Sequence, residues 1–313
     1  MKKILLLLIP LLAVGCKPGG GNRNKEADKK PVITVTIEPL RYFTEAIAGD
    51  DYRVVSMVPK GSSPETYDPT PLQLTELSQS KAFFRIGYIG FEQTWADRLA
   101  DNAPHLQFFD LSRGVDLIYD ETHAHRHQHG PGSNYREEEE AHSQAQQTDE
   151  LVGVEPHIWN SAANAQIIAG NILSALRALN KNREEVYLQR YDSLCRRLEQ
   201  TDSLICAMLS TPQADRAFMI YHPALSYFAR DYGLTQIPIE AAGKEPSPAH
   251  LKELIGLCKE EGVHVVFVQP EFDRRNAEVI ARQTGTQVVD INPLAYDWQE
   301  EMMKTARALI RED

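Results

Sequence analysis

The sequence predicts an α/β protein with two lobes, each built on a parallel β-sheet flanked by helices, joined by a long rigid helix. Three observations lead to this fold class. Short strand-like runs alternate with helical patterns over residues 32–120, the same alternation returns after residue 212, and a strongly helical stretch over 162–209 separates the two. Strands separated by helices of this length form parallel units with right-handed crossovers. A length of 313 residues fits about two domains of roughly 150 residues.

Each element is predicted from a short apolar run or from a longer helical pattern. In the first lobe we expect strand 32–37, helix 40–48, strand 52–58, helix 71–80, strand 81–86 and helix 91–101. The helical stretch that follows contains Asn182, which we expect to break it. In the second lobe we expect strand 217–221, helix 224–232, strand 236–239, helix 248–261, strand 263–268, helix 275–284, strand 287–291 and helix 298–310.

The N-terminus has the pattern of a bacterial export signal. Lys2 and Lys3 form a short basic region, an apolar stretch follows, and it ends in the run Leu-Ala-Val-Gly before Cys16. This run resembles a lipobox, in which the cysteine is lipidated and becomes the new N-terminus, although Ala13 stands where leucine is more usual. We therefore predict a lipoprotein signal peptide over 1–15 and lipidation of Cys16. An ordinary cleaved signal with a chance cysteine is the alternative.

The segments after the signal divide by composition. Residues 16–31 are rich in Gly, Asn and Lys and have almost nothing to bury, which suits a flexible tether. We predict an N-terminal lobe over 32–160, a helical linker with the long connecting helix over 161–211 and a C-terminal lobe over 212–313. No second apolar run reaches the roughly 20 residues of a membrane span. We expect an exported protein that lipid holds to a bacterial cell membrane, facing the periplasm or the cell surface.

The chain is acidic. It has 33 Lys and Arg against 44 Asp and Glu, a formal net charge of −11, and removal of the first 15 residues with Lys2 and Lys3 leaves −13. Nucleic-acid phosphates are bound by basic faces, so we expect no nucleic-acid partner. The same charge attracts cations, although salt screens this field beyond about 8–10 Å.

The segment 122–150 belongs to neither lobe. It has six acidic and four apolar residues together with five histidines: His123, His125, His127, His129 and His142. So few apolar side chains cannot offset the entropy of ordering, which predicts a mobile loop. Neutral imidazoles bind borderline metals, so we interpret the loop as an accessory segment for metal capture. A solvated low-complexity insertion without a role is the alternative.

Short catalytic and nucleotide-binding motifs are missing from the sequence, which has no G-x-x-x-x-G-K-[ST], G-x-G-x-x-G, H-E-x-x-H or G-x-S-x-G. Candidate ligands instead stand at junctions of predicted elements: Glu65, His157, His222, and Asn292 or Asp290. Ligands of open α/β sheets bind beyond the carboxyl ends of the strands, so these side chains are candidates for one shared site. Glu271 also follows a strand, and we interpret it as a residue at the rim of the core, with a supporting position behind the ligands as the alternative.

Several motifs surround these candidates. The most specific is E-P-H-I-W at 155–159, and a V-P-x-G…P-x-x-Y-x-P-T-P run spans 58–71. Further marks are I-G…E…W at 86–95, Y-F at 227–228 after His222, Y-G-L at 232–234 and E-P-S at 245–247. With these motifs the chain, from about residue 33 to 310, resembles the metal-binding (cluster A-I) solute-binding proteins of bacterial ABC importers for zinc and manganese.

The resemblance implies two α/β lobes bridged by a rigid helix, one divalent ion in the cleft and delivery of that ion to a membrane permease. His157 and His222 match the family's ligands directly. Glu65 stands where the family usually has histidine, so its position carries over with a changed donor. The family's last ligand is usually an Asp before Pro-Leu. Here Asn292 stands at that position with Asp290 two residues earlier, so Asn292, Asp290 or a water molecule completes the site.

Two features of the sequence favour different metals. Glutamate in place of histidine exchanges borderline nitrogen for hard oxygen, which favours manganese or iron. Family members that favour zinc commonly carry a His- and acid-rich loop at the place of 122–150. We expect Zn²⁺ as the bound ion, with Mn²⁺ as the alternative.

The expected partners are the divalent ion, the permease of an ABC importer with its ATPase and, through the lipid, a membrane, and we expect a monomer without enzyme activity. Two other functions fit the same residues. One is a metallohydrolase in which Glu65 is the general base beside a metal on His157 and His222. The other is an adhesin that uses this fold in cell adhesion without transport.

Overall fold

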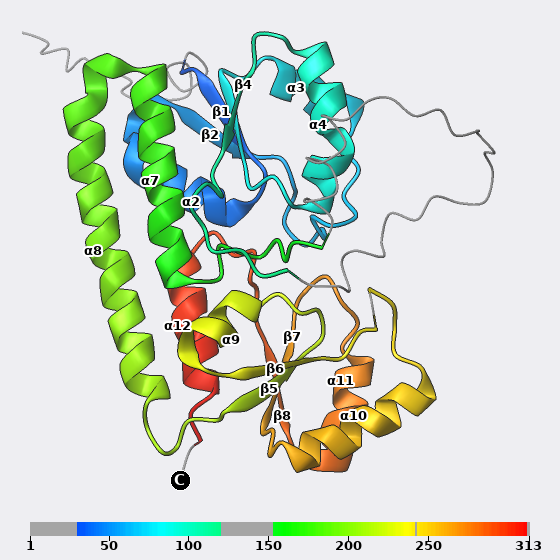
Figure 1. The fold of residues 1–313 in the computed structure, drawn as a ribbon. Coiled ribbons are helices and arrows are strands. Elements are labelled where there is room, and N and C mark those ends of the chain that lie inside the picture. The colour runs from blue at the N-terminus through cyan, green and yellow to red at the C-terminus, as the bar shows by residue number, and fades with distance from the viewer. Residues whose placement is uncertain (1–29, 120–152, 242, 312–313) are drawn as a thin grey trace, which may run out of the picture. The chain divides into compact units, whose positions relative to one another are not determined.

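The computed structural model describes residues 30–119, 153–241 and 243–311. The predicted fold class is confirmed, because the described residues form two four-stranded parallel β-sheets with helices around them (Figure 1). The predicted signal segment, Cys16 and the five histidines of the 122–150 segment lie outside the described residues. The lobe boundaries at 160 and 211 remain predictions.

The first sheet has the strand order β2-β1-β3-β4, and each neighbouring pair is parallel. Its strands are β1 (Val32–Val35), β2 (Arg53–Ser56), β3 (Ala82–Arg85) and β4 (Gln107–Asp110), and its helices are α2 (Glu38–Ala48), α3 (Pro71–Ser78) and α4 (Gly90–Asn102). A short 3-10 turn, η1 (Gly49–Asp51), follows α2. Helix α3 starts with a capping box between Thr70 and Gln73, which fixes where the long loop after β2 ends.

Strand β4 was not predicted from the sequence. It lies at the edge of the described sheet, and its four residues, Q-F-F-D, are only partly buried. So short a run, with polar residues at both ends, lacks the continuous apolar pattern that identifies the other strands. The predicted strands are present, with ends that differ by at most two residues from those expected.

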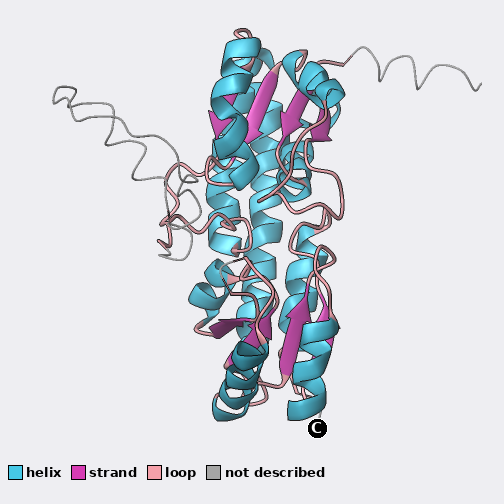
Figure 2. Ribbon diagram, turned by 90° about the vertical axis from the view of Figure 1, so that its right-hand side faces the viewer, coloured by secondary structure: helices cyan, strands magenta, loops and turns pink. Residues whose placement is uncertain are grey.

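The second sheet repeats the topology with the order β6-β5-β7-β8. Its strands are β5 (Ala217–Ile220), β6 (Thr235–Pro238), β7 (Val265–Val268) and β8 (Gln287–Asp290), and its helices are α9 (Ser226–Tyr232), α10 (Pro248–Glu260), α11 (Arg275–Thr284) and α12 (Trp298–Ala308). Figure 2 shows the two sheets in separate halves of the described chain. The strand order reverses between β5 and β7, so the loops that follow these two strands border the crevice in which such sheets bind ligands.

Two long helices connect the lobes. Helix α7 (Ala162–Leu179) is followed by the 3-10 turn η3 (Lys181–Arg183) and by α8 (Glu184–Leu209), so the predicted break at Asn182 is confirmed. Helix α8 has 26 residues and packs against α7, against α2 of the first lobe and against α12 of the second (Figure 1). The helix is thereby fixed to both lobes.

The larger of two hydrophobic core clusters among the described residues extends through both lobes. It includes Phe43 of α2 and Trp298 of α12, whose rings meet edge to face with centroids 5.4 Å apart. A second cluster covers the other face of the second sheet. Within the described residues, no helix is both long enough and apolar enough to span a membrane.

Candidate metal centre

Two buried imidazoles from distant parts of the sequence meet between the lobes. His157 precedes α7, and His222 follows β5. Their Nε2 atoms are 3.3 Å apart and their ring centroids 5.0 Å apart, and the residues are only 3% and 7% exposed. The structure therefore brings together the two histidines that the sequence analysis assigned to one site.

A buried carboxylate holds each imidazole from behind. Nδ1 of His157 is hydrogen-bonded to Glu155, and Nδ1 of His222 is hydrogen-bonded to Oε1 of Glu240 at 2.8 Å. Because an ionised carboxylate only accepts hydrogen bonds, each Nδ1 carries the hydrogen and each Nε2 presents a lone pair. This carboxylate–imidazole arrangement orients metal-binding histidines and makes them more basic.

The two Nε2 lone pairs repel each other at 3.3 Å unless a proton or a cation lies between them. Two imidazole nitrogens on one tetrahedral zinc ion, with bonds of about 2.0–2.1 Å, are separated by about 3.3 Å. The spacing of the pair thus already matches that of two ligands of a single ion.

The segment around His157 is fixed by hydrogen bonds to the second lobe. The Asn160 side chain donates to the Ala224 carbonyl at 2.8 Å, and the Trp159 indole donates to the Pro293 carbonyl at 2.8 Å. The Tyr227 hydroxyl donates to the Glu155 carbonyl at 2.9 Å. These contacts explain why the E-P-H-I-W run is buried, and they keep His157 in place without a bound ion.

His222 is held by the turn that follows β7. The Gln269 side chain accepts from the His222 N–H at 3.3 Å and donates to the His222 carbonyl at 2.6 Å. The ring of Phe272 stacks on the imidazole with centroids 5.4 Å apart and an interplanar angle of 22°. The backbone and the ring of His222 are therefore both attached to this turn.

Two further carboxylates border the same small cavity. Its volume is about 20 Å³, enough for one water-sized group, and its lining includes Glu65, Glu271 and both imidazoles. Ser63, Pro64, Ala224, Gln269, Phe272, Pro293 and Leu294 complete the lining. The residues that line it include carboxylates and imidazoles but no Lys or Arg, so the cavity suits a cation.

Glu271 was interpreted from the sequence as a residue at the rim, and the structure places it at the cavity with His222. Its Oε1 is buried and accepts no hydrogen bond from any described residue. Burial raises the pKa of Glu271, against the opposing effects of its own backbone N–H and of His222. A signal for this position was present in the sequence, because Glu271 follows a predicted strand and ligands of open α/β sheets bind beyond strand ends.

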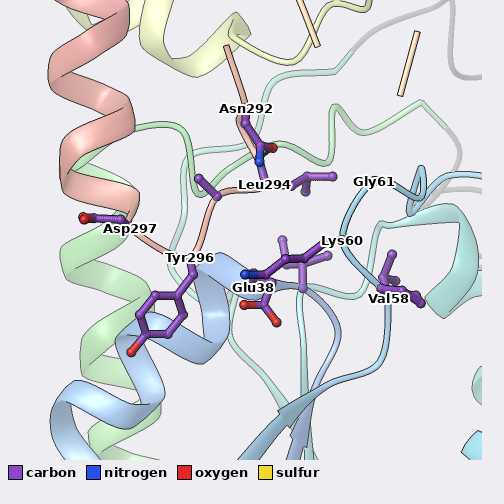
Figure 3. Close-up of a pocket in the computed structure, with 11 residues that line it drawn as sticks. Glu38, Val58, Lys60, Gly61, Asn292, Leu294, Tyr296 and Asp297 are labelled. Carbon is purple, nitrogen blue, oxygen red and sulfur yellow. Dashed lines mark hydrogen bonds between the residues drawn. The ribbon is translucent and has the colours of Figure 1, made fainter. Parts of the chain in front are cut away.

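The other two candidate ligands lie elsewhere. Asp290 is 69% exposed at its side chain and forms an ion pair with Arg274 at 3.2 Å. The Asn292 side chain accepts a hydrogen bond from the Leu294 N–H at 3.1 Å and lines a neighbouring pocket of about 320 Å³, together with Lys60 of the first lobe (Figure 3). Neither residue lines the cavity of the two imidazoles.

Across the described ranges, no three His, Cys, Asp or Glu side chains stand close enough together to form a finished metal site. The imidazole pair is in place, so a bound ion requires the carboxylates at the edge of the cavity to turn inward. Rotation of a glutamate side chain about its own bonds is a small change compared with a movement of the main chain.

This two-lobed fold, with imidazoles and carboxylates around one small cavity, is that of a solute-binding protein. A sequence profile of the family "Zinc-uptake complex component A periplasmic" matches residues 33–311. The chain belongs to this family, a family of substrate-binding proteins of metal ABC transporters.

Individual relatives carry names for two metals. The high-affinity zinc uptake system protein ZnuA of Bacillus subtilis is 28% identical over 298 residues, which are 93% of this chain and 87% of the relative. The zinc-binding lipoprotein AdcA of Streptococcus pneumoniae is 25% identical over 94% of this chain, which spans only 56% of that relative's length. The manganese ABC transporter substrate-binding lipoprotein PsaA of Streptococcus anginosus is 25% identical over 91% of this chain and 87% of its own.

A solved structure agrees with this assignment. The crystal structure of a ZnuA deletion mutant with zinc bound is 32% identical, with a TM-score of 0.75, and the match covers 91% of this chain and 100% of that one.

Proposed function

We propose that this protein is a solute-binding lipoprotein that captures a divalent transition metal in the cleft between its lobes and delivers it to an ABC permease for import. Zinc is the ion that we expect. The observation that carries the proposal is the buried pair of imidazole nitrogens, 3.3 Å apart, each with a carboxylate behind it. This pair supplies two preorganised donors, His157 and His222, and Glu65 supplies a third from the first lobe.

Zinc is supported by the spacing of the pair and by the names of the relatives. A tetrahedral site with bonds of about 2.05 Å gives a spacing near 3.3 Å, whereas neighbouring ligands of an octahedral ion with similar bonds lie about 2.9 Å apart. Manganese is the alternative, because Glu65 offers hard oxygen and one relative is named for manganese.

The size of the cavity supports binding rather than hydrolysis. A volume of about 20 Å³ accommodates an ion or a water molecule, but not an ester or a peptide bond beside a metal-bound water. The family's description as a zinc-uptake complex component agrees with this.

The remaining parts of the proposal concern the cell. Lipidation of Cys16 holds the exported protein, a monomer, to the bacterial membrane, facing the periplasm or the cell surface. The histidines of the 122–150 segment collect ions for the cleft. The permease and its ATPase then receive the ion.

The test is Zn²⁺ titration calorimetry with a competing chelator on the mature chain in which all five histidines of 122–150 are replaced by Gln. We expect one tight ion per chain, and we expect its loss in the double variant His157→Ala/His222→Ala. The double variant His250→Ala/His264→Ala is the control, since both imidazoles lie outside the cavity. Tight binding that survives the loss of His157 and His222 would refute the proposal.

A further inference from the structure

We propose that Glu271 is the fourth protein ligand of the captured ion, so that each lobe contributes a carboxylate to the two imidazoles. This inference rests on the proposed function, because it concerns the same cavity. Glu271, which follows a different strand, then takes the role of fourth ligand that the sequence had assigned to Asn292 or Asp290.

The strand order of the second sheet places Glu271 near His222. His222 follows β5 and Glu271 follows β7, and these neighbouring parallel strands lie on the two sides of the point where the strand order reverses. The loops after two such strands leave the sheet in opposite directions and open a crevice between them. Glu271 therefore stands on the wall of that crevice opposite the loop of His222.

The turn that carries Glu271 is also attached to His222. Glu271 sits in a turn closed by a hydrogen bond of 3.2 Å from the Phe272 N–H to the Gln269 carbonyl. Gln269 holds the backbone of His222, and Phe272 stacks on its ring. Because residues on both sides of Glu271 are attached to His222, the backbone of Glu271 has a fixed place beside this imidazole, within a side-chain rotation of the cavity.

The Glu271 carboxylate also has an oxygen atom that lacks a hydrogen-bond partner among the described residues. This atom, Oε1, is buried, although buried polar atoms nearly always have a partner. The atom lies in a residue that lines the cavity with both imidazoles. An ion bound there gives this oxygen the partner that the protein does not.

The alternatives have other partners. Asp290 is ion-paired with Arg274, and the Asn292 side-chain oxygen is bound to the Leu294 N–H. Each would have to give up its contact and enter a cavity that it does not line. Two carboxylates also balance the two positive charges of the ion, which a neutral Asn292 would leave half balanced in a buried place.

The experiment measures Zn²⁺ affinity by chelator competition, and Co²⁺ absorption in the visible range, on the mature chain with the five histidines of 122–150 replaced by Gln. The test variant is Glu271→Gln, which keeps shape but loses charge and donor strength. Asp290→Asn is the matched control, since it makes the same carboxylate-to-amide change at another strand end of the same sheet. Asn292→Ala tests the remaining alternative.

We expect Glu271→Gln to lower Zn²⁺ affinity about a hundredfold or more, since even a residue behind a ligand costs about 10–100-fold. The Co²⁺ bands should shift in position and intensity, while Asp290→Asn and Asn292→Ala leave both measurements as in the parent. Thermal unfolding without metal checks that the Glu271 variant folds. If it does not fold, Glu271→Ala and Glu271→Asp are measured in its place.

Three results would overturn the inference while the proposed function stands: unchanged affinity in Glu271→Gln, reduced affinity with unchanged Co²⁺ bands, or the expected loss appearing in Asp290→Asn or Asn292→Ala. A parent chain that binds no ion tightly would instead overturn the proposed function, and the inference with it.

Discussion

Gly90 lies so close to the main chain of Glu65 that a β-carbon at position 90 would be 2.4 Å from the Glu65 carbonyl oxygen. The contact joins the start of α4 to the loop after β2. The Phe91 N–H donates to the Pro64 carbonyl at 3.1 Å beside it. Only a residue without a side chain allows the two loops to approach this closely, so Gly90 helps to set the position of the Glu65 carboxylate.

We therefore predict that Gly90→Ala weakens metal binding by about tenfold, or about 1.4 kcal/mol, because the backbone of Glu65 has to shift. The crowding should also lower the unfolding free energy of the metal-free protein by about 1–3 kcal/mol. The measurements are chelator competition and denaturant unfolding. Gly256→Ala is the control, since a β-carbon there meets nothing within 4 Å and only favours helix α10. Equal metal affinity in Gly90→Ala and its parent would contradict the role given to Gly90.

A second prediction concerns the carboxylate behind His222. Glu240→Gln keeps an acceptor for the Nδ1 hydrogen but removes the negative charge behind the imidazole ring. We expect Zn²⁺ affinity to fall about 10–100-fold, with an unchanged number of ions bound. The control is Glu253→Gln, which makes the same change in the exposed pair of His250 and Glu253 on α10. An effect of the same size in both variants would mean that general charge, and not the contact with His222, is responsible.

A third prediction concerns pH and the buried Glu92. Burial raises the pKa of Glu92 to about 7, although hydrogen bonds from Thr36 and from the N–H groups of Ile86 and Gly87 oppose this. The native state therefore holds a proton that the unfolded chain releases near pH 4.5, so the contribution of Glu92 to stability is complete at low pH and is lost as pH rises toward 7. The loss amounts to about 3 kcal/mol.

The variant Glu92→Gln should not have this dependence. Its unfolding free energy, relative to that of the parent, should rise between pH 5 and pH 8 when metal-free protein is unfolded with denaturant. A difference that stays constant over this range would show that Glu92 does not hold the proton.

The sequence allowed most of the fold to be predicted because the signals were local. Of the eight strands in the described part of the chain, seven correspond to apolar runs, and Asn182 marked the break between α7 and α8. Strand β4 was missed because a partly buried edge strand owes its pairing to β3 and not to its own pattern.

The site could be predicted only in part. His157 and His222 stood in recognisable motifs. Glu155 stands in the motif of His157, but its role and that of Glu240 follow from hydrogen bonds that form only in the folded chain. Glu271 stood at a strand end, but its approach to His222 depends on the pairing of β5 with β7, which no local pattern encodes. The same holds for Asn292, whose side chain turns toward a neighbouring pocket.

The contacts of α8 with α2 and α12, and the core that passes from one lobe into the other, restrict how an ion can enter and leave. A wide swing of the two halves would expose the buried rings of Phe43 and Trp298 to water, at a cost of several kcal/mol. We therefore expect ion exchange to depend on local opening of the turn between β7 and α11 that carries Glu271, and not on a rotation of the lobes.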